Sequence, residues 1–160
     1  MTLSHNCTHK QPNASMCFVC GRDNPVGLKM QFYDNAQDSV ASELTLDERF
    51  QGYPEIVHGG ILASVLDEVV GRVAMVGDHH HFMMTVVMKV QYRQPVLINT
   101  PITAVGKIVR LRGRLGKAEG KIFLPDGSIA CEAELTLADM PSEIATQSRM
   151  LALGWRIDAD

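Results

Sequence analysis

The chain has 160 residues, of which 46% are apolar and 21% are charged, and its formal net charge is -3. These values are typical of one globular domain with its own core, and they give no electrostatic reason to expect binding to nucleic acid or to a membrane. No apolar stretch reaches the roughly 20 residues that span a bilayer, and the N-terminus has no apolar signal core, so we expect a cytoplasmic protein.

Residues 1–27 form a polar, irregular leader whose spacing C-x-H-x7-C-x2-C joins four candidate metal ligands: Cys7, His9, Cys17 and Cys20. Such a set suits a structural zinc ion, and His5 is an equal candidate for the fourth position. Zinc would explain how a loop-like leader stays ordered. The alternative to zinc is that Cys17 and Cys20 simply pack. Four cysteines are too few to indicate a disulfide framework.

After the leader, the pattern predicts strands on either side of one helix. Residues 28–34 and 39–46 alternate like a hairpin, and a loop follows. The helix is expected at about 60–76, where Gly77 ends it. Further strands are expected within 82–96, with Met84, Val86, Met88, Val90 and Tyr92 on one face, and at 102–112, 120–124 and 129–137.

A long helix that is apolar nearly all round must be covered by a sheet that wraps it or by a partner. We therefore predict an α+β fold in which a curved antiparallel sheet of five to six strands wraps around one long central helix. The chain divides into the leader at 1–27, the main domain at 28–140 and a C-terminal helix or tail at 141–160.

Two acidic residues lie in the middle of the helix, in VHGGILASVLDEVVG. Glu68 precedes Arg72 by four residues, and this pair is interpreted as a routine surface or interface salt bridge. Asp67 is surrounded on its helical face mostly by small residues, which leave room for a ligand or another chain to reach its carboxylate. The alternative for Asp67 is an exposed polar edge or a structural network.

Gly59 and Gly60 begin the same helix, where unpaired N–H groups emerge with a partial positive charge. A carbonyl oxygen can approach these bare N–H groups as it does in an oxyanion hole, although a glycine turn packed on the sheet is the alternative. Gly59 and Asp67 are eight residues, or about 12 Å, apart along the helix. A site that used both would need two antiparallel helices in a two-fold dimer.

The segments CFVCGRDNPVGL, GYPEIVH and HGGILASVLDEVVG resemble the hotdog-fold thioesterases, and most closely the phenylacetate-pathway type and related acyl-CoA thioesterases. The resemblance covers about residues 17–138. It implies an enzyme that hydrolyses an acyl-CoA thioester to free acid and CoA, as a homodimer or a dimer of such dimers, with no cofactor required for catalysis.

Carried over residue by residue, the resemblance implies that Asp67 is the general base or nucleophile. The Gly59 N–H would polarise the thioester carbonyl, with Gly60 beside it at the substrate. His58 would orient the loop or the substrate, and Thr85 would position water or the carboxylate.

One position departs from the family pattern. Many members carry Asn or Gln six residues before the motif histidine, where this chain has Gly52. Either the neighbouring Gln51 substitutes after a one-residue shift of the loop, or the group is absent. For the CoA phosphates, the resemblance points to a set of basic residues, although a solvated charged face is the commoner interpretation: Arg93, Arg110 and Arg112, with Lys107, Arg114 and Lys117.

Two other functions stay open on the sequence alone. A non-catalytic acyl-CoA-binding or regulatory hotdog protein would suit the missing amide and the cysteine-rich leader. A hydratase or dehydratase ranks lower, because such enzymes usually need a histidine together with an acid, and no histidine follows His58 on the helix.

Overall fold

The computed structural model describes residues 6–159, so His5 lies outside the described residues. Its elements follow one another along the chain as β1 (His9–Lys10), β2 (Tyr33–Asp34), β3 (Ser39–Thr45), η2 (Glu48–Phe50), α1 (Gly59–Gly71), η3 (Arg72–Met75), β4 (Met83–Tyr92), β5 (Pro101–Arg112), β6 (Leu115–Phe123), β7 (Ile129–Asp139) and α2 (Gln147–Ala152).

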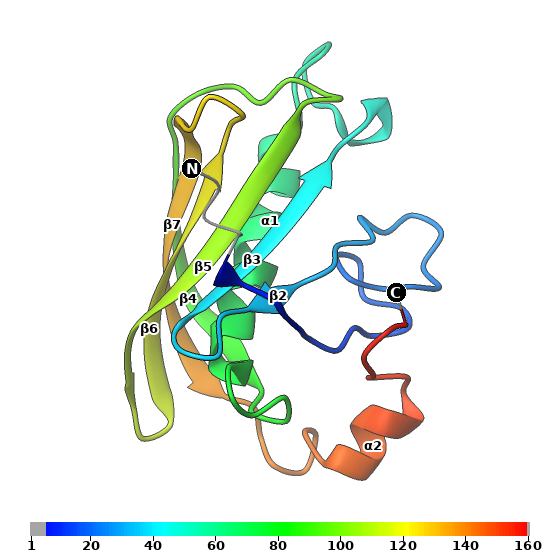
Figure 1. The fold of residues 1–160 in the computed structure, drawn as a ribbon, viewed down its shortest axis with the longest axis vertical. Coiled ribbons are helices and arrows are strands. Elements are labelled where there is room, and N and C mark those ends of the chain that lie inside the picture. Colours follow the sequence, from blue (N-terminus) through cyan, green and yellow to red (C-terminus); the bar gives the residue numbers. More distant parts are fainter. Residues whose placement is uncertain (1–5, 160) are drawn as a thin grey trace.

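The strands form one seven-stranded sheet in the order β1-β2-β3-β5-β6-β7-β4, with antiparallel neighbours throughout. The sheet curves around α1, and β4 forms one edge (Figure 1). This confirms the predicted wrapped helix. The strand expected at 28–34 forms only at its end, because the chain before β2 pairs with the leader instead: the N–H of Met30 donates to the carbonyl of Val19 at 3.0 Å.

Helix α1 is buried along the face that the sheet covers, through Leu62, Val65, Leu66, Val69 and Val70. Two glycines that are Cα partners on β5 and β6, Gly106 and Gly120, make this close packing possible. A Cβ at Gly106 would lie 2.5 Å from the carbonyl oxygen of Val69, and one at Gly120 would lie 2.5 Å from Cγ2 of Val70.

Strand β4 contains a bulge that changes which side chains face the helix. Its pairing with β7 shifts between Thr85 and Val87, so Val86 is the extra residue. Met83 is buried before the bulge, whereas Met84 is exposed. The prediction of one uninterrupted face from Met84 to Tyr92 is therefore wrong. Thr85 and Tyr92 lie on either side of the bulge and are an odd number of residues apart, so in a regular strand they would face opposite sides. Because of the bulge, both contact α1.

The leader packs over the C-terminal end of α1, where it buries Arg72. The Arg72 guanidinium lies 3.9 Å from the ring centroid of Phe32, and Nη1 donates to the carbonyl of Pro12 at 2.8 Å. Nη2 donates to Glu68 Oε1 at 2.9 Å. The predicted ion pair of Glu68 with Arg72 therefore forms, but Arg72 is only 1% exposed, so the pair lies beneath the leader rather than on the surface.

The C-terminal segment also packs around the buried Arg72. Trp155 lies edge-on against Phe82, with ring centroids 5.4 Å apart, and Arg72 lies 5.4 Å from the Trp155 ring centroid. The N–H of Asn13 donates to the carbonyl of Arg156 at 2.8 Å, which joins the tail to the leader. The predicted helix or tail is thus a short helix, α2, followed by a docked segment (Figure 1).

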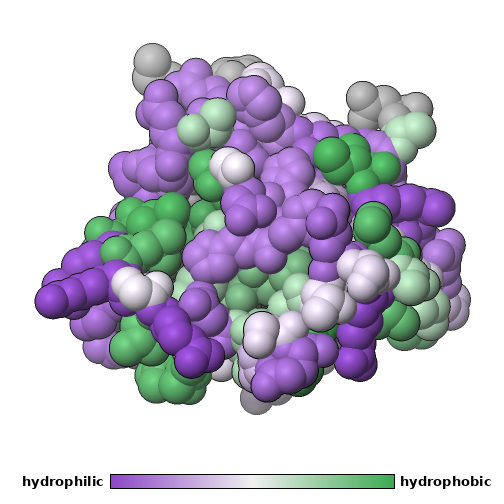
Figure 2. Space-filling model, turned by 90° about the horizontal axis from the view of Figure 1, so that it is seen from below, coloured by the Kyte–Doolittle hydropathy of each residue, from purple (hydrophilic) through white to green (hydrophobic). Residues whose placement is uncertain are grey.

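The lower face of the molecule shows apolar patches separated by hydrophilic side chains (Figure 2). Exposed apolar side chains cluster at the β5–β6 hairpin and near the C-terminus: Val109, Leu111, Leu115, Leu151, Leu153 and Ile157. Across residues 6–159, the structure has no helix of the length and apolar character that a membrane span requires.

Candidate active site

The carboxylate of Asp67 lies on the exposed side of α1, beside β4. The hydroxyl of Thr85 donates to Asp67 Oδ1 at 2.7 Å, so a residue of the edge strand orients this carboxylate. Within the described part of the chain, Oδ2 has no hydrogen-bond partner. One oxygen is therefore held while the other is open to solvent or to a ligand, which suits either a general base or a nucleophile.

At the start of α1, His58 is the N-cap residue. Its Nδ1 accepts a hydrogen bond from the N–H of Gly60 at 2.9 Å, which places the ring proton of a neutral imidazole on Nε2. The Gly60 N–H is thereby satisfied, whereas the Gly59 N–H has no partner among residues 6–159. Of the two glycines, Gly59 supplies the free donor at the positive end of the helix.

Tyr92 fixes the backbone at this free donor, a contact that the sequence pattern does not predict. Its hydroxyl donates to the carbonyl of Gly59 at 2.8 Å. A Cβ at Gly59 would lie 3.3 Å from Cε1 of Tyr92, and one at Gly60 would lie 3.0 Å from Nδ1 of His58. Both positions thus lack side chains because an aromatic ring and the capping imidazole lie against them.

A cavity of about 700 Å³ opens beside the free donor. Gly59, Leu62 and Tyr92 line it together with His58, and the loop between β4 and β5 forms its other wall through Arg93, Gln94, Pro95 and Val96. A volume of this size lies within the range of small-molecule sites. The unpaired N–H, the apolar walls and the arginine at the rim make it the best candidate for an acyl or thioester-binding site.

The loop before the cavity shows why the family amide is missing. Gln51 is exposed, and its Oε1 accepts a hydrogen bond from the N–H of Glu55 at 3.1 Å, so its side chain stabilises the loop turn. Gly52 lines the cavity, and a Cβ there would lie 3.2 Å from both Cα and Cδ2 of His58. A side chain such as that of Asn or Gln at this position would crowd His58 and would require it to shift by a few tenths of an ångström.

The predicted phosphate-binding arginines lie at opposite ends of the sheet. Arg93, at the rim of the cavity, donates through Nε to Glu132 Oε1 at 3.0 Å. Arg110 and Arg112 lie at the end of β5 that pairs with the start of β6, and both are exposed with no ion pair in the described chain. Arg110 and Arg112 are level with the start of β4 and Thr85 rather than with Tyr92, but β6 and β7 separate them from β4.

The structure does not bring the four predicted zinc ligands together. Cys17 and Cys20 lie beside Glu68, whereas the thiol of Cys7 donates to the carbonyl of Ser39 at 3.8 Å and His9 lies beside the main chain of β2. Of the residues described, only one group of three possible ligands is gathered, and it contains neither Cys7 nor His9. A hydrogen bond from the Cys20 thiol lowers the pKa of Cys17 below its ordinary value.

Comparison with known proteins matches residues 55–131 to the family model of the thioesterase superfamily. A solved thioesterase superfamily protein is 28% identical with a TM-score of 0.69, and the match covers 76% of this chain but only 62% of that protein. The E. coli PaaI protein of the phenylacetic acid degradation operon is 12% identical with a TM-score of 0.64, over 71% of this chain and 81% of that one.

A hypothetical thioesterase from Streptococcus pneumoniae, solved with coenzyme A, is 18% identical with a TM-score of 0.60, over 64% of this chain and 79% of that one. At these identities PaaI and the Streptococcus protein share the fold. Together with the family match, they confirm the expected hotdog fold of the thioesterase superfamily.

Proposed function

Because residues 55–131 match the thioesterase superfamily and the chain has the fold of its solved members, we propose that this protein is an acyl-CoA thioesterase. The observation that carries the proposal is the pairing of two features on one helix. One is an exposed carboxylate, Asp67, held by Thr85; the other is the free N–H of Gly59 beside the cavity.

In the proposed reaction, the Gly59 N–H donates to the thioester oxygen and stabilises the negative charge that develops on it. Asp67 either removes a proton from water, whose oxygen then bonds to the carbonyl carbon, or bonds to that carbon itself before water releases the acid. The carbon–sulfur bond breaks, and the thiolate of CoA leaves and takes up a proton. A thiolate is a good leaving group, so this set of groups is sufficient.

The two features must come from different subunits, because one carbonyl cannot reach both Asp67 and Gly59 of the same helix across about 12 Å. Edge strand β4 offers the matching interface. It is unpaired on one side and exposes apolar side chains: Met84, Val86, Val87 and Tyr92. Antiparallel pairing of β4 with its copy about a two-fold axis would place the Thr85 end of one strand beside the Tyr92 end of the other.

This dimer would also place basic residues of both subunits at the same end of the sheet. Arg93 lies at the Gly59 end of a subunit, and Arg110 and Arg112 lie at its Asp67 end. In an antiparallel pair, the arginines of β5 would lie at the same end of the dimer as the cavity of the partner subunit, with β6 and β7 between them and the interface strand, and would offer positive charge to the CoA phosphates together with Arg93. The solved Streptococcus protein with coenzyme A supports this choice of ligand.

The function is tested by incubating the purified protein with short, medium-chain and aromatic acyl-CoA esters and measuring free CoA thiol. We expect turnover on the order of 1 s⁻¹ or faster for at least one ester. Binding of acyl-CoA without hydrolysis of any ester would contradict the proposal and indicate a binding or regulatory protein. Addition of water to an enoyl-CoA with the thioester left intact would indicate a hydratase instead.

A further inference from the structure

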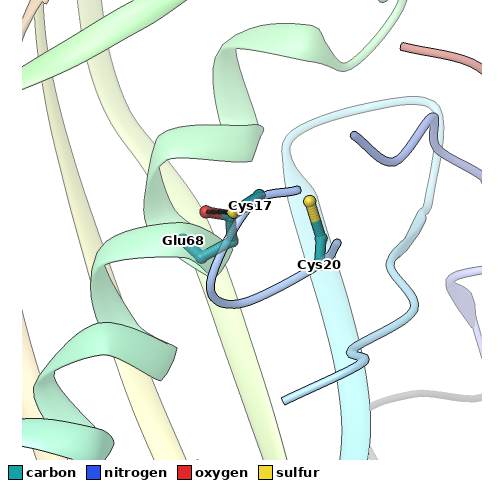
Figure 3. A group of neighbouring side chains, drawn as sticks. All are labelled: Cys17, Cys20 and Glu68. Atoms are coloured by element: carbon teal, nitrogen blue, oxygen red, sulfur yellow. Dashed lines mark hydrogen bonds between the residues drawn. The ribbon is translucent and has the colours of Figure 1, made fainter. Parts of the chain in front are cut away.

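Three possible metal ligands from two distant segments meet beneath the leader. The sulfurs of Cys17 and Cys20 and a carboxylate oxygen of Glu68 all lie within 4.8 Å of one another. Figure 3 shows the loop with both cysteines lying against α1, with Cys17 meeting Glu68. Cys20 is buried, and the other two are partly buried. The proposed thioesterase mechanism uses none of these groups.

The turn that carries the cysteines directs main-chain donors at both sulfurs. The N–H of Val19 donates to Cys17 Sγ at 3.3 Å, and the N–H of Ala14 donates to Cys20 Sγ at 3.5 Å. The next residue, Gly21, must lack a side chain, because a Cβ there would lie 2.3 Å from the carbonyl oxygen of Cys17. N–H groups that point at sulfur stabilise negative charge on it, which is the state that a metal-bound thiolate needs.

The spacing of the three ligand atoms fits a tetrahedral ion. With bonds of about 2.0–2.3 Å to oxygen and sulfur, ligand atoms around zinc lie roughly 3.5–3.8 Å apart. The Sγ atom of Cys17 lies 3.7 Å from Glu68 Oε2. The remaining pairs of ligand atoms lie within 4.8 Å of each other, so shifts of about 1 Å or less would bring them into this range.

The charges around the cluster balance with one divalent cation. Arg72 holds Glu68 Oε1 through Nε at 3.0 Å and Nη2 at 2.9 Å, which leaves Oε2 toward the sulfurs. Two thiolates and one carboxylate carry three negative charges, and a divalent ion with the Arg72 guanidinium carries three positive charges. A buried site that is neutral as a whole avoids the penalty of uncompensated charge.

We propose that Cys17, Cys20 and Glu68 bind one zinc ion, with a solvent molecule in the fourth position, and that this ion fastens the leader to α1. Two thiolates and one carboxylate favour zinc over calcium or magnesium, which prefer oxygen ligands alone. The ligand set differs from the one that the cysteine and histidine spacing predicts, because Glu68 of the helix takes the place of Cys7 and His9.

The test is to load the reduced full-length protein with zinc, dialyse it, and measure bound zinc in the wild type, Cys17→Ser, Cys20→Ser and Cys7→Ser. The last variant is the matched control, since Cys7 is a partly buried leader thiol outside the cluster. We expect about one zinc per chain in the wild type and in Cys7→Ser, and at least a tenfold loss in the other two. Cobalt in place of zinc should give a sulfur-to-metal charge-transfer band that only Cys17→Ser and Cys20→Ser abolish.

Treatment of the wild-type protein with a chelator tests the proposal even if a variant fails to fold. Removal of zinc from the wild type should lower its melting temperature by about 5–10 °C, the shift expected for a ligand at roughly a hundred times its dissociation constant. Wild-type protein that retains no zinc, a folded Cys17→Ser that retains a full equivalent, or loss of zinc in Cys7→Ser would each overturn the proposal. None of these readouts depends on thioesterase activity.

Discussion

Asp67→Asn is expected to lower kcat for acyl-CoA hydrolysis by about 10²–10⁴-fold, because it removes the carboxylate that we propose activates water or attacks the carbonyl. The amide keeps the shape of the carboxylate, and its oxygen still accepts the hydrogen bond from Thr85, so the fold should be unchanged. The loss should appear in kcat, with little change in KM, when free CoA is measured at saturating substrate.

Glu134→Gln is the matched control for this change. Glu134 is an exposed carboxylate on β7, so its substitution removes the same charge without touching α1. We expect this variant to keep wild-type activity. If Asp67→Asn keeps a third or more of the wild-type kcat, Asp67 does not have the role proposed for it.

Arg72→Leu is expected to lower the free energy of unfolding by about 3–5 kcal/mol, which is the usual effect of breaking a buried ion pair. The change removes the donors to Pro12, Asn13 and Glu68, and it leaves the Phe32 ring without its cation. Denaturant titration in the presence of chelator measures the loss without any contribution from bound metal.

Arg49→Leu provides the comparison, because Arg49 pairs with Asp47 on the exposed surface. Its substitution should change stability far less, since exposed ion pairs contribute little. A loss below about 1 kcal/mol in Arg72→Leu would mean that the leader is held by its main-chain contacts rather than by the guanidinium.

The elements with strong periodicity were predictable from sequence. The apolar positions of α1 placed the helix at 60–76, and the structure divides that stretch into α1 and the short helix η3. The bulge at Val86 was not predictable, because an inserted residue leaves the apolar alternation of β4 unbroken in the sequence. Because the bulge is not predictable, the sequence predicts the face on which Tyr92 lies but not its hydrogen bond to Gly59.

The sequence predicts several residues of the candidate site, but it does not predict most of the contacts that these residues make. The family resemblance predicts that Thr85 positions water or the carboxylate, and in the structure its hydroxyl donates to Asp67. Helical spacing predicts the pair of Glu68 with Arg72, but it does not predict the leader that buries Arg72. The cysteine spacing predicts a zinc site of Cys7, His9, Cys17 and Cys20, whereas the structure gathers only Cys17 and Cys20, beside Glu68 of the helix.

The most direct test of the shared site is activity in mixed dimers of Asp67→Asn chains with Gly59→Val chains, in which the valine crowds Tyr92 and blocks the approach to the free N–H. Each homodimer should be inactive. A mixed dimer keeps one subunit's acid opposite the other's intact amide, so it should recover about half of the wild-type activity per dimer. Isolated mixed dimers as inactive as their parents would show that both groups serve a site within one subunit, or none.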